Sequence, residues 1–235
     1  MAKIYVIRHG QASFGEANYD KLSDLGCRQA QVLGEYFREC GVQFDAVYSG
    51  DLQRQRKTAE ITIAGQSAAI PHHIDPRFNE INNDEQLENL VPEIVKTNAA
   101  LRALIEKGLS ASKDYQKVID AVFNYWVSPA CQNPHIQSWG DYSSKVKAAL
   151  SAVIEAQGAG KTVAIFTSGG TIATIVSQVL GLGGEHAYKF YEPVINCSVT
   201  QLFYSGNRVS LSYFNDNSAL NLLGRGYGEE LLTYR

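Results

Sequence analysis

Short apolar runs alternate with amphipathic stretches along the chain. Residues Ala2–Ile7 form a nearly continuous apolar run rich in β-branched residues, which is typical of a central strand buried on both faces. From Ser23 the apolar residues recur at helical spacing instead, with Ser23 or Asp24 placed to cap the helix and Gly41 to end it. The N-terminal pattern therefore predicts a strand followed by a helix.

The alternation continues to the C-terminus. The further elements predicted are strands over 44–48, 71–75 and 162–166, a basic helix from about Asp51, amphipathic helices over 139–156 and 171–180, and a hairpin of 196–204 with 208–214. Strands that alternate with helices predict a three-layer α/β/α fold around a mostly parallel central sheet. We expect a single domain over residues 1–235, with 85–137 as a helical insertion that carries no obvious chemistry.

Composition limits the function classes. The 235 residues are 45% hydrophobic and 19% charged, which suits a buried core and not a disordered chain. The net charge of −3 gives no general attraction to nucleic acid or to an anionic membrane, and no apolar run approaches the roughly 18 residues of a membrane span. The four cysteines are not in C-x-x-C pairs, and the N-terminus lacks signal-peptide features. We expect a cytoplasmic protein with no nucleic-acid or membrane partner.

Candidate chemistry follows three of the predicted strands. In such a sheet, ligands bind at the carboxyl ends of the strands. Arg8 and His9 follow the first strand, Arg54 follows the second, and the segment Thr167–Gly170 follows a later one. Arginine side chains, a helix N-terminus and backbone N–H groups all bind anions, and phosphate in particular. The absence of a carboxylate cluster in these segments disfavours a magnesium site.

A histidine among arginines has a distinct reactivity. The neighbouring positive charges would lower the pKa of His9 and keep its imidazole neutral and nucleophilic at pH 7. Such a ring can attack a bound phosphoryl group and form a phosphohistidine that water later hydrolyses. The arginines would stabilise the charge on the phosphoryl oxygens in the transition state.

Four segments in order carry a family resemblance. They are Arg8-His9-Gly10-Gln11, the helix Leu22–Ala30, which is similar to L-T-x-x-G-x-x-Q-A, the segment Tyr48–Ala59, which is similar to S-x-L-x-R-A-x-x-T-A, and Phe78-Asn79-Glu80. With these segments the chain resembles the histidine phosphatase superfamily, also called phosphoglycerate mutase-like. The resemblance implies a phosphoglycerate mutase-like fold, His9 as phosphoryl acceptor, Arg8 and Arg54 as phosphate ligands, Glu80 as the acid that protonates the leaving group, and no metal or cofactor.

The chain departs from the family pattern in three places. The family's second histidine lies in a segment like S-H-G-G, and Ser168 occupies its position here. A serine hydroxyl, together with amides such as that of Gly169 at the start of the next helix, could replace part of that phosphate ligand. Losing one such donor costs about 10²–10³ in rate, which need not abolish activity. Gln55 replaces a common alanine, and Gly15 replaces an asparagine that contacts substrate in the mutases, which favours hydrolysis.

The sequence thus predicts a metal-independent phosphatase that acts through His9. Its expected partner is a small phosphorylated substrate or phosphate, and the sequence leaves open whether the protein forms a homodimer. One alternative is a pseudophosphatase that binds a phosphorylated ligand without turning it over. Another is a serine hydrolase using Ser168, although Phe166 stands where its motif requires glycine. Glu80 could equally be an exposed loop carboxylate. His72 and His73 suggest a metal site, but neighbours on a strand point to opposite faces.

Overall fold

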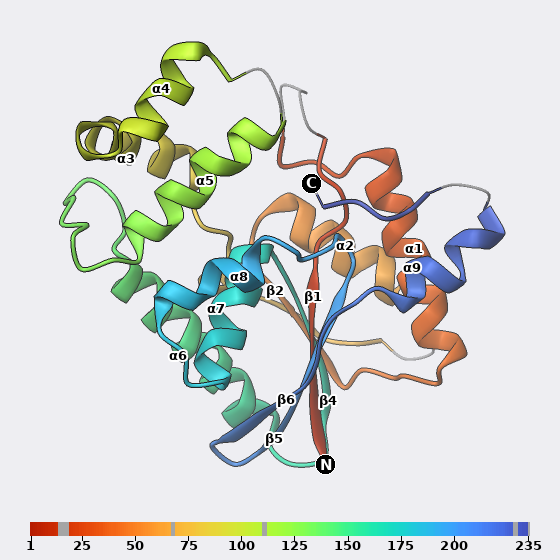
Figure 1. Ribbon diagram of the computed structural model, residues 1–235. Helices are drawn as coiled ribbons and strands as arrows, with labels where there is room; N and C mark the ends of the chain where they lie inside the picture. Colours follow the sequence, from red (N-terminus) through yellow and green to blue (C-terminus); the bar gives the residue numbers. More distant parts are fainter. Residues whose placement is uncertain (14–18, 67–68, 110–111, 228–229, 235) are drawn as a thin grey trace.

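Six strands form one mixed sheet at the centre of the protein (Figure 1). The computed structural model describes residues 1–13, 19–66, 69–109, 112–227 and 230–234. Within them the strands are β1 (Ala2–Arg8), β2 (Ala46–Ser49), β3 (His72–Ile74), β4 (Thr162–Thr167), β5 (Val199–Ser205) and β6 (Arg208–Asp216). Their order across the sheet is β3-β2-β4-β1-β5-β6, with parallel pairing from β3 to β1 and antiparallel pairing of β5 with both neighbours. The predicted α/β fold with a mostly parallel sheet is confirmed.

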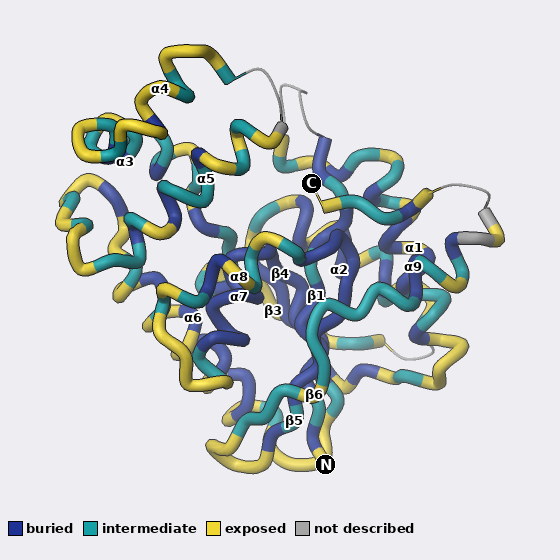
Figure 2. The backbone as a smooth tube through the Cα atoms, in the orientation of Figure 1, coloured by how far each residue is buried: buried dark blue, intermediate teal, exposed yellow. Residues whose placement is uncertain are grey.

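Alternate residues of the central strands pack into two separate cores. Ile4 and Val6 of β1 contribute to one core, whereas Tyr5 and Ile7 contribute to the other. Both cores are closed by helices, and the dark-blue centre of Figure 2 shows how completely the strands are covered. Burial on both faces explains why β1 reads as a continuous apolar run rather than an alternating one.

Helices cover both faces of this sheet. On the face of Tyr5 lie α1 (Asp24–Glu39), α2 (Gln53–Ile63) and α9 (Ser218–Leu222). On the face of Ile4 lie α6 (Trp139–Gln157), α7 (Gly169–Val179) and α8 (Ala187–Tyr191). Within the described residues, no helix is long and apolar enough to cross a membrane.

Three more helices occupy the stretch expected to be an insertion. They are α3 (Asn83–Thr97), α4 (Ala99–Lys107) and α5 (Ser112–Trp126). They form a lobe beside α6 and α8 (Figure 1). Helix α5 joins this lobe to the main body through aromatic contacts. Phe123 lies 5.7 Å from Tyr191 between ring centroids, and Trp126 lies 5.3 Å from Trp139. This aromatic cluster links the lobe to the helices that follow the sheet.

Helix α7 begins two residues earlier than its sequence pattern predicts. Gly169 and Gly170 form its first turn, although glycine weakens helices and is more typical of a loop. A Cβ at Gly169 would lie 3.0 Å from the Tyr191 ring, and one at Gly170 would overlap the side chains of Ile81 and Glu80. The two glycines therefore allow two other segments, α8 and residues 80–81, to approach this helix closely.

The segment after β1 lies against the first turn of α1 through another pair of glycines. A Cβ at Gly26 would overlap the carbonyl oxygen of Gln11, and one at Gly10 would overlap the carbonyl of Gly26. Ser23 caps the helix by accepting a hydrogen bond from the Gly26 N–H at 3.0 Å. The position of residues 9–11 thus depends on the absence of side chains at this contact.

We expect Gly26→Ala to lower the free energy of unfolding by about 1–3 kcal/mol, because the added methyl group forces backbone apart in a packed region. Urea denaturation measures this change. The matched control is Gly140→Ala in α6, where the nearest atom to a Cβ is Ser138 Oγ at 3.8 Å. That variant should be as stable as the wild type or more so, and equal losses in both variants would contradict the proposed contact.

Candidate active site

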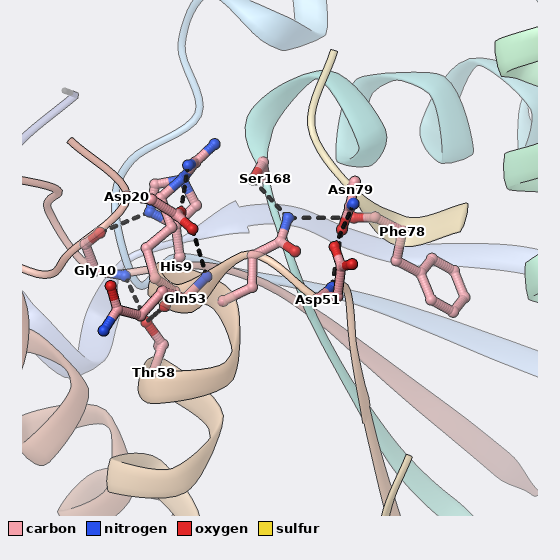
Figure 3. A network of polar contacts seen from close by, with 11 residues as sticks. His9, Gly10, Asp20, Asp51, Gln53, Thr58, Phe78, Asn79 and Ser168 are labelled. Carbon is pink, nitrogen blue, oxygen red and sulfur yellow. Dashed lines mark hydrogen bonds and ion pairs between the residues drawn. The ribbon is translucent and has the colours of Figure 1, made fainter. Parts of the chain in front are cut away.

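The predicted site residues gather where β1 and β4 end. The two strands are parallel and pair Arg8 with Thr167, and the His9 N–H donates to the Thr167 carbonyl at 2.9 Å. The next residue along each strand therefore reaches the same edge of the sheet, His9 from β1 and Ser168 from β4. Figure 3 shows both side chains there with their polar partners.

The hydrogen bonds of His9 select one tautomer of its ring. Nε2 lies 3.1 Å from Arg54 Nε, which can only donate, so Nε2 accepts and carries a lone pair. Nδ1 lies 2.7 Å from the carbonyl oxygen of Gly10, which can only accept, so Nδ1 carries the hydrogen. The structure thus presents a neutral imidazole whose Nε2 carries the lone pair, which accepts the Arg54 N–H in the free protein.

The surroundings of His9 favour the neutral ring. The side chain is 4% exposed, and burial holds the pKa of His9 well below its usual range. The positive charges of Arg54 and Arg8 lower this pKa further, against a smaller opposing effect of the Gly10 carbonyl. Burial and like charge both penalise an imidazolium here, so the ring stays unprotonated at neutral pH.

Arg54 is held between His9 and a carboxylate. Its Nη1 donates to Asp20 Oδ1 at 2.7 Å, while Asp20 Oδ2 accepts the Gln53 N–H at 2.7 Å. Asp20 therefore caps α2 from a distant loop, at a helix start where Leu52 supplies no side-chain cap. The Tyr19 ring lies 5.6 Å from the guanidinium carbon of Arg54. These contacts leave further guanidinium N–H groups of Arg54 for an anion.

Arg8 is anchored at one end only. Its Nη1 donates to the Val194 carbonyl, but its Nε is buried and has no hydrogen-bond partner among the described residues. Burial lowers the pKa of this guanidinium, and electrostatic interactions with Tyr191 and Glu80 offset part of that decrease. A buried unpaired donor costs about 1–3 kcal/mol, and a bound anion would remove that penalty. Because a Cβ on Gly169 would lie 3.9 Å from Arg8 Nε, this donor faces the start of α7.

Glu80 lies against the same helix start. Its Oε1 accepts the N–H groups of Gly170 and Ile81, both at 3.0 Å. Burial raises its pKa, while Arg54, Arg8 and the two N–H groups oppose the rise. The side chain is partly buried rather than exposed, so the interpretation of Glu80 as a solvated loop carboxylate does not describe it. A carboxyl group with a raised pKa beside two arginines is suited to donate a proton.

Ser168 is fully buried at the N-cap position of α7 but does not cap it. Its hydroxyl makes no hydrogen bond to the helix and instead accepts the Gln55 Nε2–H at 2.8 Å. Gly169 follows as the first residue of the helix. Of the two residues predicted to bind phosphate, Gly169 thus lies close to Arg8 Nε, while Ser168 precedes it and contacts Gln55.

Asn196 and Asp20 carry no clear sequence signal, whereas Thr58 lies in the segment 48–59 that carries the family resemblance. Asn196 donates to the His9 carbonyl at 3.0 Å from 187 residues away, and Asp20 lies in an unremarkable polar loop. Thr58 accepts the Gly10 N–H at 3.0 Å and donates to the Arg54 carbonyl at 2.7 Å. Its spacing of four from Arg54 on one helix could have suggested this role. Gly15, the position that separates this chain from the mutases, lies outside the described residues.

The paired histidines of β3 do not converge. His72 Nε2 lies 2.8 Å from Ser49 Oγ, whereas the His73 ring stacks on Tyr48 at 4.9 Å between centroids. Among the described residues, no group of three or more His, Cys, Asp or Glu side chains is arranged to hold a metal ion.

Comparisons with known proteins place this geometry in a family. The model of the histidine phosphatase superfamily (branch 1) matches residues 4–217. A curated phosphoglycerate mutase of Candida albicans is 31% identical over 87 residues, which are 34% of this chain and 35% of that protein. The matched stretch thus spans about a third of the length of this relative.

Solved structures share the whole fold at lower identity. A phosphoserine phosphatase of Entamoeba histolytica superposes with a TM-score of 0.65 at 19% identity, covering 94% of this chain and 100% of that one. A phosphoglycerate mutase of Bacillus anthracis gives 0.66 at 22% identity, covering 94% and 95%. These similarities establish the phosphoglycerate mutase-like fold.

We expect the nitrogen chemical shifts of His9 to show protonated Nδ1 and unprotonated Nε2 at neutral pH. Because burial and two arginines depress its pKa, the ring should stay neutral when the pH is lowered from about 7.5 to about 5.5, a range in which an ordinary histidine gains its proton. Nitrogen-15 NMR of the imidazole groups, assigned with His9→Ala, measures both properties. A His9 signal that titrates near pH 6.5, or the opposite tautomer, would contradict this geometry.

Proposed function

The chain belongs to the histidine phosphatase superfamily, and we propose that it is a metal-independent phosphatase that hydrolyses a small phosphomonoester through a phosphohistidine on His9. The observation that supports this most directly is the His9 tautomer. A neutral ring offers the lone pair of Nε2 beside the guanidinium groups of Arg8 and Arg54. A nucleophile placed beside two fixed positive charges suits attack on a phosphoryl group.

In the first step, the Arg54 Nε–H shifts from His9 Nε2 to a phosphoryl oxygen, which frees the lone pair. His9 Nε2 then attacks phosphorus while the bond from phosphorus to the leaving oxygen breaks. Arg8 and Arg54 stabilise the negative charge spread over the phosphoryl oxygens. Glu80, whose raised pKa favours the protonated form, gives its proton to the leaving oxygen, so an alcohol departs. The Nδ1 hydrogen stays on the ring and donates to the Gly10 carbonyl, which stabilises the positive charge of the phosphorylated imidazole.

In the second step, water attacks phosphorus and the phosphorus–nitrogen bond breaks. Glu80, now a carboxylate, takes a proton from that water, which restores the acid. Orthophosphate leaves, and His9 returns to its neutral form with the lone pair on Nε2. Every proton is accounted for by Glu80 and water, and the cycle requires no metal or cofactor.

Related proteins and one departure in the sequence support hydrolysis of a phosphomonoester as the reaction. Phosphatase and mutase relatives share the fold, and a similar solved structure is named for its action on phosphoserine. We favour hydrolysis over a mutase reaction because Gly15 replaces the asparagine that contacts substrate in the mutases. Tyr191 packs against Gly169 and accepts the Asn83 Nδ2–H at 3.1 Å, so its ring lies at the start of α7, the helix turn that Glu80 also contacts.

We expect the wild type to hydrolyse p-nitrophenyl phosphate in the presence of EDTA, and His9→Ala to lose at least about 10³-fold in kcat, as removal of a nucleophile does. Steady-state kinetics with melting temperatures for both proteins measure this. The matched control is His135→Ala, because His135 is an exposed histidine away from the site, and it should retain full activity. Equal, negligible rates in wild type and His9→Ala would favour a phosphate-binding pseudophosphatase.

We expect Glu80→Gln to lower kcat for phosphoserine by about 10²–10⁴, but to lower it less for p-nitrophenyl phosphate, whose leaving group needs little protonation. The raised pKa of Glu80 keeps the acid protonated to higher pH than an ordinary glutamate. The wild-type rate with phosphoserine should therefore fall as pH rises through that pKa, and the variant should lack this decline. An equal loss for both substrates would argue against proton donation by Glu80.

A further inference from the structure

Gln55 is a buried amide whose contacts the reaction above does not require. It is fully buried in the first turn of α2, next to Arg54. Its Nε2 lies 2.8 Å from Ser168 Oγ and 3.2 Å from the carbonyl oxygen of Phe78. Consecutive residues of one helix thus reach neighbouring strand ends: Arg54 contacts His9 after β1, and Gln55 contacts Ser168 after β4.

The Phe78 carbonyl fixes the orientation of this amide. A carbonyl can only accept, so the Gln55 atom that faces it must be the nitrogen. Thr167 Oγ1 also donates to the same carbonyl, at 2.5 Å, which holds it in place. Gln55 therefore approaches Ser168 with an N–H group, and Ser168 Oγ is the acceptor in this contact.

An accepting Ser168 has its hydroxyl hydrogen left for another partner. Among the described residues, Gln55 is the one hydrogen-bond partner of Ser168 Oγ, and the helix amides receive no cap from it. Ser168 adjoins Gly169, whose surroundings include the unpaired Nε of Arg8. Ser168 thus has a hydroxyl hydrogen without a described acceptor, at the strand end next to the one that carries His9.

The fold makes room for this amide. Gln55 Oε1 is buried without a partner among the described residues, and it lies so close to Gly50 that a Cβ there would overlap it. A glycine after β2 is therefore required for Gln55 to reach Ser168. The amide keeps this position although one of its own atoms stays unsatisfied, so its contacts with Ser168 and the Phe78 carbonyl together offset that cost.

We propose that Gln55 is a positioning residue that turns the Ser168 hydroxyl so that its hydrogen binds the phosphoryl group. This inference rests on the proposed phosphatase site. Gln55 and Ser168 then act as one neutral unit, and together they replace the histidine that the family pattern expects at residue 168. The two departures from that pattern compensate each other because each supplies the partner that the other needs.

A double-mutant cycle tests this unit. The proteins are wild type, Gln55→Met, Ser168→Ala and the double variant, and the readout is the affinity for orthophosphate and vanadate by isothermal titration calorimetry. Met keeps the approximate shape of Gln without the donor. We expect each single change to weaken binding by about 10- to 100-fold, as for a hydrogen bond to a charged group. The double variant should bind no worse than Ser168→Ala, because both changes remove the same donor.

The matched control is Gln178→Met at the other end of α7. Gln178 Nε2 likewise donates to a serine, Ser143 Oγ at 2.9 Å, and its Oε1 is likewise buried without a described partner. This variant should lose stability without losing phosphate affinity. A Gln55→Met variant that behaves in the same way, with a lower melting temperature and unchanged affinity, would overturn the proposal, and so would additive losses in the cycle.

Gln55→Glu provides a second route should Gln55→Met not fold. It keeps the shape but offers an acceptor, so Ser168 would turn its hydrogen toward residue 55. Introducing Gln55→Glu both into the wild type and into the Ser168→Ala variant separates this effect from the added charge, and the loss of affinity should be larger when Ser168 is present. An equal loss in both proteins would contradict the proposal.

Turnover of p-nitrophenyl phosphate in the same samples separates this inference from the proposed function. If the losses of phosphate affinity are non-additive but the wild type turns over no faster than His9→Ala, the Gln55–Ser168 unit is supported and the phosphatase function is contradicted. If the wild type turns over faster than His9→Ala but the losses of phosphate affinity are additive, the phosphatase function is supported and the unit is contradicted. A wild type that binds neither orthophosphate nor vanadate would overturn the unit.

Discussion

The site depends on the hydrogen bond from Arg54 Nε to His9 Nε2. This bond requires a lone pair on Nε2, so it holds the ring neutral and in the tautomer that can act as a nucleophile. It also requires Arg54 to be fixed, which Asp20 achieves from one side and Thr58 from the other. Gly10 completes the arrangement, since its carbonyl accepts from Nδ1 while its N–H donates to Thr58. A single contact therefore links the loop after β1 to the first turns of α2.

This arrangement places positive charges in the site that nearby carboxylates only partly neutralise, which destabilises the free protein. Two guanidinium groups lie beside a buried imidazole, and Arg8 retains a buried donor without a described partner. Glu80 offsets part of this field, although burial raises its own pKa. A phosphoryl group supplies the missing negative charge and the missing acceptors at once. The same imbalance that lowers the stability of the free protein thus favours binding of a phosphorylated ligand.

The sequence predicted the strands, the main helices and the gathering of Arg8, His9 and Arg54, because strand ends and helix starts follow from local pattern and parallel topology. It could not predict Asn196 or Asp20, whose contacts join segments far apart in the chain. The start of α7 was also placed too late, since the propensity of two glycines is overridden there by close packing. The comparisons established the family and the fold, whereas the roles of individual residues stay predictions.

The predicted replacement of a family histidine by Ser168 is best understood through the neighbouring Gln55. A serine alone would be too short and too mobile about its χ1 to substitute for an imidazole. With the Gln55 N–H bound to its oxygen, the hydroxyl loses that freedom and its donor is directed by geometry rather than by charge. In the proposed site, a neutral donor at residue 168 makes phosphate binding independent of a second imidazole titration. The pH dependence proposed for the site then falls on Glu80 and His9, whose pKa values are shifted in opposite directions.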